Sequence, residues 1–336
     1  MRVRTKKKKR RVMRGVLLAI AGLLLAAIAA CLVSPLPMAY LIRAAFNTSP
    51  AVEPEGYQAM CEQVLVTHDA AYPSQFQNNL ADVYVPKTGD GPFPVVLWVH
   101  GGAFVGGQKS DVAFFATALA AQGVAVVCMG YQRAPEAQYP TPVLQVGEAI
   151  AWLQSVANDY ALDTTRLMLA GDSAGAHIVS QFAAVQTSPA YAQMMRMTPS
   201  LAPDVIKAVL LYCGPFDAAG IAQSDSALMN FVLGRAAWAY FGTGDWATRF
   251  AQEATVANGV TADFPPAFIT DGNKLSFETH GRALADVLRQ HGVPVETYFV
   301  PIEDEEAIHE YQFMMNTPAA QEAFTRTLAF IRAQTP

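Results

Sequence analysis

The amino-acid sequence predicts an α/β fold: a mostly parallel central sheet with helices on both faces, preceded by one N-terminal transmembrane helix. Three observations lead to this prediction. A long uncharged segment lies near the N-terminus. From about residue 62 onward, short apolar runs alternate with helix-like segments. A serine flanked by glycines follows one of the apolar runs. The 336 residues are enough for one large α/β domain and a short appendage.

The N-terminal segment has the composition of a membrane anchor. Residues 1–14 carry nine Lys and Arg residues and no acid, and residues 16–33 carry no charge. As a helix, this uncharged segment would span roughly 27 Å, close to the hydrocarbon thickness of a bilayer. Positive charge precedes the segment and almost none follows it, which places the N-terminus in the cytoplasm and the rest of the chain outside it. Residues 15–42 are therefore interpreted as a signal anchor with its membrane exit.

Two alternatives to a retained anchor are a cleaved signal peptide and a lipoprotein signal. The run "IAAC" resembles a lipobox in which Cys31 would carry the lipid. The apolar character continues past Cys31 through "LVSPLPMAYLI", which favours a membrane exit over a new N-terminus.

The basic tail does not indicate a nucleic-acid partner, because the net charge of −5 divides into +9 for the tail and −14 for the remainder.

Beyond the membrane segment, the chain is divided into a linker at 43–61 and an α/β domain at 62–336. Apolar runs predict strands at 95–100, 124–131, 166–173, 206–214, 266–272 and 295–301. Helices are expected at about 111–122, 142–159, 278–291 and 318–333. A further helix is expected directly after Ser173, at the end of the third of these strands. A stretch rich in Ala and aromatic residues, at about 215–262, interrupts the alternation. We expect it to form a helical cap insertion over an apolar pocket.

The cysteines do not predict a disulfide framework or a metal site. Cys31 lies in the membrane segment, and Cys61, Cys128 and Cys213 are widely spaced. Cys128 and Cys213 occur in apolar, strand-like runs, which is typical of buried cysteines that pack as small hydrophobic residues.

The motif "GDSAG", Gly171 to Gly175, fits the pattern G-x-S-x-G. It lies between an apolar strand and a helix, where two glycines allow the sharp turn that exposes a nucleophilic serine hydroxyl. Ser173 is therefore the candidate nucleophile. The alternative, a glycine-rich turn with an incidental serine, does not account for this strand–turn–helix context.

A second glycine motif, "HGGAF", follows the strand that ends at His100. Acyl transfer builds negative charge on a carbonyl oxygen, and fixed backbone N–H groups can stabilise that charge. Gly101 and Gly102 are candidate donors, and the amide of Ala174, just after the nucleophile, is a further candidate. His100 is expected to hold this loop by hydrogen bonding.

The candidate general base is His309. It follows the last predicted strand, so its loop should emerge at the edge of the sheet where Ser173 lies. His177 comes four residues after Ser173 on the next helix and is expected to point away. His280 and His291 fall on or after a helix, and His68 precedes the core of the domain.

The motifs "HGGAF", "GDSAG", "YQRAPEAQYP" and "HEYQF" together resemble the hormone-sensitive-lipase and carboxylesterase branch of the α/β-hydrolase fold, over about residues 62–334. This resemblance implies a cofactor-independent hydrolase of carboxylic esters. It implies Ser173 as nucleophile, His309 as base and oxyanion donors from Gly101, Gly102 and Ala174. The order serine, acid, histidine also fits the family.

The acid of the expected triad departs from the family pattern. Family members usually carry Gly-x-x-Asp in the stretch "TDGNKLSFETHG", but Leu275 stands at the position of that Asp. Two carboxylates flank it. Glu278 is preferred, because its longer side chain could return from the next turn, and Asp271 is the alternative. Glu278 also suits a helix N-terminus and Asp271 a turn, so a serine–histidine dyad without an acid stays open.

The function predicted from the sequence is a membrane-anchored serine hydrolase whose partners are a small-molecule ester and, through the N-terminal helix, the membrane. A peptidase or amidase would use the same residues. A catalytically silent binding module is a further alternative, which the missing acid at Leu275 supports and the exposed serine opposes. The sequence predicts no metal and assigns no oligomeric state.

Overall fold

The computed structural model describes residues 2–46, 51–202 and 204–335, and contains an eight-stranded sheet of order β1-β2-β4-β3-β5-β6-β7-β8. Strand β2 is antiparallel to β1 and β4, and all other neighbours are parallel. The strands are β1 (Val64–Ala71), β2 (Leu80–Pro86), β3 (Phe93–Val99), β4 (Ala125–Met129), β5 (Leu162–Asp172), β6 (Ile206–Tyr212), β7 (Ala267–Asp271) and β8 (Val295–Phe299).

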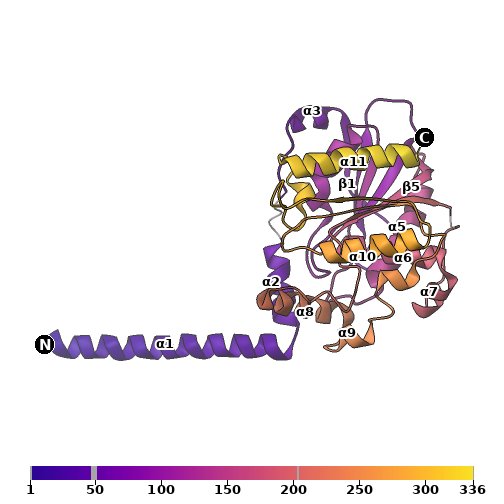
Figure 1. The fold of residues 1–336 in the computed structure, drawn as a ribbon. Coiled ribbons are helices and arrows are strands. Elements are labelled where there is room, and N and C mark those ends of the chain that lie inside the picture. Colours follow the sequence, from indigo (N-terminus) through magenta and orange to yellow (C-terminus); the bar gives the residue numbers. More distant parts are fainter. Residues whose placement is uncertain (1, 47–50, 203, 336) are drawn as a thin grey trace.

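Helices cover both faces of the sheet (Figure 1). The central strand β3 shows why: successive side chains of a strand point to opposite faces, and all of its last five residues are buried. Val95 and Leu97 belong to the core on one face, and Val96 and Trp98 to the core on the other. The first face carries α5 (Thr141–Ser155), α6 (Ala174–Thr187), the short α7 (Pro189–Met194) and α10 (Glu278–Gln290); the second carries α3 (Tyr57–Glu62), α4 (Ala113–Ala120) and α11 (Pro318–Gln334).

The predicted α/β architecture is confirmed, and each predicted strand corresponds to one of β3 to β8. The antiparallel pair β1 and β2 was not among the predicted strands. Cys128 and Cys213 are fully buried, in agreement with the expected packing role.

The expected cap region contains helices, as predicted. Between β6 and β7 lie α8 (Ala227–Phe241), α9 (Trp246–Arg249) and the 3₁₀ turn η2 (Val256–Gly259). Tyr240 and Phe241 of α8 are buried, and Tyr240 stacks on Phe104 of the loop after β3 with ring centroids 4.0 Å apart. The cap is thus joined to that loop by aromatic packing.

The N-terminal region consists of two helices with different surroundings. Helix α1 (Arg2–Val33) extends away from the domain (Figure 1). Its segment Val12–Val33 has a mean hydropathy of 3.0 and is not buried against the rest of the protein. A bilayer anchor and a signal sequence both fit this segment. Helix α2 (Leu36–Ala45) packs on the domain. It overlaps the expected membrane exit and the start of the expected linker, and α3 lies at the end of that linker.

Candidate active site

Ser173 lies on a sharp turn between β5 and α6. Its backbone has φ 50° and ψ −118°, a region that L-residues seldom occupy and that the flanking glycines make accessible. A Cβ atom on Gly171 would lie 2.4 Å from the carbonyl carbon of Gly175, and one on Gly175 would lie 1.9 Å from the carbonyl oxygen of Val99. Both positions therefore require glycine. The turn sets Ser173 at the carboxyl edge of the parallel strands.

His309 lies in the loop after β8, and its Nε2 is 2.9 Å from Ser173 Oγ. The side chain is 26% exposed, and its ring packs edge-on against Phe277. Burial lowers the pKa of His309 to about 4, so the imidazole is neutral near pH 7 and one ring nitrogen is free to accept a proton.

Ser276 connects His309 to Asp271. Ser276 Oγ is 2.8 Å from His309 Nδ1, and the same hydroxyl donates a short hydrogen bond to Asp271 Oδ1. Because the Ser276 proton goes to the carboxylate, its oxygen is left to accept from Nδ1–H. This chain of hydrogen bonds assigns the imidazole proton to Nδ1 and leaves Nε2 to accept from Ser173.

The loop after β7 is fixed against the loop before His309. The Asn273 side chain donates to the carbonyls of Val300 (3.0 Å) and Glu305 (2.7 Å) and accepts from the amide of Ala307 (3.1 Å). A Cβ atom on Gly272 would lie 2.5 Å from the carbonyl oxygen of Ala307, so glycine permits this close approach. These contacts bring Ser276 to the imidazole.

The two carboxylates that the sequence nominated occupy different places. Asp271 is 1% exposed at the end of β7 and reaches His309 through Ser276. Glu278 begins α10, and its Oε1 pairs with Arg282 at 2.6 Å; the hydrogen bonds of the described residues include none between Glu278 and His309. Leu275, at the expected acid position, is 63% exposed.

Sequence reasoning did not find Ser276. The available signal was its position: it directly follows Leu275 in the loop where an acid was expected. A serine in such a loop is common, and only the folded geometry distinguishes it from an ordinary turn residue.

Asp271 lies in surroundings that disfavour its charged form. Burial raises the pKa of Asp271 to about 7, and the hydrogen bond from Ser276 offsets only part of that effect. Its second oxygen, Oδ2, is buried and has no hydrogen-bond partner among the described residues.

Cys213 Sγ, a carboxylate oxygen of Asp271 and a nitrogen of His309 lie within 4.8 Å of one another, a set that could hold a metal ion. Two of these groups already belong to the hydrogen-bonded chain.

The loop after β3 supplies the candidate oxyanion donors. The amide of Gly101 donates to Asp172 Oδ2 at 2.7 Å and is therefore already used. The amides of Gly102 and Ala174 donate no hydrogen bond to another loop within the described part of the chain. Gly102 has φ 110°, and a Cβ atom there would lie 2.4 Å from Gly106. The loop thus turns tightly, with the amide of Gly101 fixed to Asp172, the residue that precedes Ser173.

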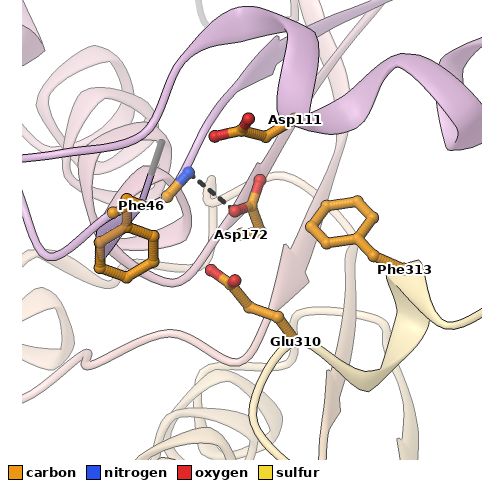
Figure 2. Close-up of a pocket in the computed structure, with 7 residues that line it drawn as sticks. Phe46, Asp111, Asp172, Glu310 and Phe313 are labelled. Atoms are coloured by element: carbon orange, nitrogen blue, oxygen red, sulfur yellow. Dashed lines mark hydrogen bonds between the residues drawn. The ribbon is translucent and has the colours of Figure 1, made fainter. Parts of the chain in front are cut away.

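A pair of acidic side chains joins three loops of the site. Asp172 accepts from the indole of Trp98 (2.7 Å) as well as from Gly101, and the carboxyl group of Glu310, which follows His309, lies on the same side of Gly101. Burial raises the pKa of Asp172 to about 6, and burial together with the neighbouring Asp172 raises the pKa of Glu310 well above its usual value. Figure 2 shows both acids at a small pocket lined by Phe46, Gly101, Gly102, Asp111, Asp172, Glu310 and Phe313.

The other candidate histidines lie away from Ser173. His177 Nε2 contacts the carbonyl of Ala254 at 2.8 Å, and burial lowers the pKa of His177 to about 4. His280 accepts from the amide of Asp217, and His68 lies 3.3 Å from Asp82. His100 Nδ1 is 2.7 Å from the carbonyl of Gly101 and its ring stacks on Tyr131, so it contacts the loop that it was expected to hold.

Comparison with known proteins gives one family and several relatives. The family model described as BD-FAE matches residues 81–277, more than half of the chain. Carboxylesterase NlhH of Mycobacterium tuberculosis is 29% identical over 262 residues, which cover 74% of this chain and 76% of that protein. A probable isoprenylcysteine alpha-carbonyl methylesterase of Oryza sativa subsp. japonica is 33% identical over 124 residues, or 37% of this chain and 29% of that protein. The chain thus matches less than a third of the rice protein's length.

The solved structures that resemble this chain show its fold. Esterase B from Lactobacillus rhamnosis superposes with a TM-score of 0.73 at 21% identity, covering 92% of this chain and 95% of that one. A bacterial heroin esterase superposes with a TM-score of 0.65 at 20% identity, covering 88% and 97%. The chain therefore has the α/β-hydrolase fold expected from its motifs.

Proposed function

This chain belongs to the BD-FAE family, and we propose that it is a membrane-anchored serine hydrolase that cleaves carboxylic esters through an acyl-enzyme. The observation that carries the proposal is the 2.9 Å contact between His309 Nε2 and the hydroxyl of Ser173 on its glycine-flanked turn. That contact is the arrangement of a nucleophile with its general base.

The reaction begins with acylation. Ser173 Oγ attacks the ester carbonyl carbon while His309 Nε2 takes the hydroxyl proton. The carbonyl oxygen becomes an oxyanion, which the amides of Gly102 and Ala174 stabilise. The tetrahedral intermediate then collapses, the bond to the alcohol oxygen breaks, and His309 returns the proton to the leaving alkoxide. Water repeats the sequence on the acyl-enzyme and releases the acid.

Ser276 and Asp271 orient the imidazole in this proposal. Asp271 takes the acid's role through the Ser276 hydroxyl, which keeps the proton on Nδ1 and stabilises the imidazolium that forms. Gly101 acts indirectly, because its amide fixes the loop to Asp172. Glu278 takes no part in the reaction, since its carboxylate pairs with Arg282.

The chain organisation that accompanies this proposal is a cytoplasmic basic tail, one membrane-spanning helix and a catalytic domain on the opposite side. The support is the apolar segment Val12–Val33 and the positive charge before it. A thiol-reactive reagent that cannot cross membranes would test the topology on a cysteine introduced at exposed Thr88. Labelling in intact cells supports the proposal, and labelling only after lysis contradicts it.

The activity is tested with the full chain in detergent and a short-chain p-nitrophenyl ester. We expect turnover in the parent chain and a loss of at least about 10³-fold in kcat for Ser173→Ala, because the nucleophile is removed. A fluorophosphonate probe should label the parent chain and not the variant. A folded parent chain that neither turns over the ester nor takes the label would contradict the hydrolase and favour a binding module. Turnover of an anilide in preference to the ester would favour an amidase.

A further inference from the structure

We infer that the catalytic edge of the domain faces the bilayer and that the natural substrate is an amphiphilic ester, which reaches the site from the membrane along α2 and α8. This inference rests on the proposed hydrolase function and adds a substrate class to it. It also assigns a role to α2, which the sequence indicated only as membrane exit and linker.

The link between the membrane helix and the domain is too short to let them separate. Only Ser34 and Pro35 stand between α1 and α2. The amide of Ser34 donates to the carbonyl of Ala30 at 3.0 Å, and the Ser34 hydroxyl accepts from the amide of Leu36 at 3.2 Å. The end of α1 and the start of α2 are thus joined by hydrogen bonds as well as by the backbone. Wherever α2 is docked, the membrane surface lies close by.

Helix α2 is docked beside the catalytic loops. Arg43 donates from Nε to the carbonyl of Val105 (2.7 Å) and from Nη2 to the carbonyl of Ala134 (2.5 Å). Its guanidinium also pairs with Glu136 at 2.6 Å, a two-pronged contact that fixes the orientation of the side chain. Ala39 and Ile42 of α2 are buried against the domain. Val105 belongs to the loop that carries Gly101 and Gly102, so α2 is held at the oxyanion side of the site.

The residue after α2 reaches a small pocket beside the candidate oxyanion loop. Phe46 lines the same small pocket as Gly101, Gly102 and Glu310 (Figure 2). It also packs closely on the oxyanion loop: a Cβ atom on Gly106 would lie 3.2 Å from the Phe46 side chain. A continuous path of contacts therefore runs from the membrane helix through α2 to the loop that carries the candidate oxyanion donor Gly102.

The surface around α2 and α8 is apolar and incompletely covered. The two helices pack against each other and lie at the end of α1 (Figure 1). Four large apolar side chains are exposed there, Leu36 (45%), Tyr40 (50%), Leu41 (59%) and Leu228 (73%). We call these four residues the α2–α8 patch. The first turns of α8, "ALMNFVLG", carry no charge. The single charge of α2, on Arg43, is neutralised by Glu136.

The occupant that fits this patch is the lipid bilayer. Exposed apolar patches next to a membrane helix insert into the interface, where their burial is favourable. A soluble partner protein would cover the patch equally well, but the anchor already holds the bilayer within two residues of it. An ester dissolved in that bilayer is then concentrated at the mouth of the site, whereas a water-soluble ester gains nothing from the position.

The test uses the full chain in phosphatidylcholine vesicles and two probes, p-nitrophenyl acetate in the water and p-nitrophenyl palmitate in the membrane. A variant carries about 12 Gly and Ser residues inserted between Ser34 and Pro35, which adds a flexible reach of roughly 20 Å. We expect kcat/KM for the palmitate ester to fall by about tenfold and that for the acetate ester to stay within about twofold. The matched control has the same insertion between Thr88 and Gly89, in an exposed turn before β3, and should change neither value.

A pair of point variants tests the surface itself. Leu41→Glu together with Leu228→Glu places charge in the α2–α8 patch and should selectively slow the palmitate ester. Leu65→Glu is the control, because Leu65 on β1 is 57% exposed and lies outside the patch. Equal rates for the parent chain, the variant with the insertion after Ser34 and the patch double variant on the palmitate ester would overturn the inference. A loss on both esters with intact controls would also overturn it, since α2 would then act only as part of the fold. No turnover of either ester by the parent chain would instead contradict the proposed function.

Discussion

The nucleophile turn and the acid loop are built in opposite ways. The turn at Ser173 is determined locally: Gly171 and Gly175 each exclude a Cβ atom, and a strand and a helix directly flank the serine. The acid loop depends on contacts between distant segments. Asp271 and His309 are 38 positions apart and meet only through Ser276 and the Asn273 contacts that hold the two loops together. In the proposed site, the candidate nucleophile is therefore placed by a local motif, whereas the orienting group is placed by contacts between distant loops.

The largest effect in the acid loop is expected for Asp271→Asn. If Asp271 orients the imidazole through Ser276, the variant loses the charge that keeps the proton on Nδ1 and stabilises the imidazolium. We expect kcat to fall by about 10³- to 10⁴-fold, with KM nearly unchanged, since the acid acts in the transition state. Steady-state kinetics on a short-chain ester measures this. A decrease of less than about tenfold would mean that the site works as a serine–histidine dyad.

Ser276→Ala is expected to have a smaller effect than Asp271→Asn. Removal of the hydroxyl breaks the link between His309 and the carboxylate, but a water molecule can take the place of Oγ. We expect kcat to fall by about 10- to 100-fold, which corresponds to the loss of a charge-assisted hydrogen bond.

Ser276→Asp is the matched control for that loss. It places a carboxylate directly at Nδ1, where it can replace the relay, although Asp271 nearby opposes a second charge. A variant with Ala at position 276 that retains full kcat would show that Asp271 does not act through Ser276. Recovery of activity in Ser276→Asp alone would support the relay.

The pH dependence follows from the same loop. As pH falls through about 7, Asp271 takes a proton and can donate to Ser276. The Ser276 hydroxyl then donates to Nδ1, the imidazole proton moves to Nε2, and His309 can no longer accept from Ser173. Activity should therefore fall below about pH 7. If His309 alone controlled the acid limb, activity would persist to about pH 4.

A pH profile of kcat/KM separates these two origins. The parent chain should lose activity with a midpoint near pH 7, and Asp271→Asn should keep its residual activity to a lower pH, because the titrating carboxyl is gone. Circular dichroism at each pH provides the control for unfolding. An acid limb that stays at the same pH in both proteins would assign it to another group, of which Asp172 with Glu310 is the nearest.

The sequence was sufficient to predict what depends on local pattern. Burial of both faces gives β3 and β5 unbroken apolar runs, and the "GDSAG" turn follows one of them, so the strands and Ser173 are identified by short-range rules. The position of His309 after the last predicted strand nominated it as the base, and the family order of motifs agreed. The antiparallel β1 and β2 were missed. Strand β1 is largely exposed and lacks an apolar run that would have marked it.

What could not be predicted depends on side-chain geometry across loops. A count of positions from Gly272 led to Leu275, and helix geometry made Glu278 plausible, but neither indicated that Ser276 Oγ would lie between a carboxylate and an imidazole. The fixing of Gly101 by Asp172 is similar, because that hydrogen bond joins residues 71 positions apart. Helix α2 was interpreted as membrane exit because its composition is apolar, and its docking depends on contacts of Ala39, Ile42 and Arg43 with residues far away in the sequence.

Glu278→Gln should have the smallest effect of these variants. It tests directly whether Glu278 or Asp271 orients the imidazole. Glu278 begins α10 and pairs with Arg282, four residues later on the same helix, where such exposed pairs contribute about 0.3–0.5 kcal/mol. We expect kcat within about twofold of the parent value and a slight loss of thermal stability, which activity assays and thermal melts would measure. A loss of several orders of magnitude in kcat would assign the orienting acid to Glu278. It would also require α10 to move during catalysis, since its first turn now holds that carboxylate on Arg282 and away from the imidazole.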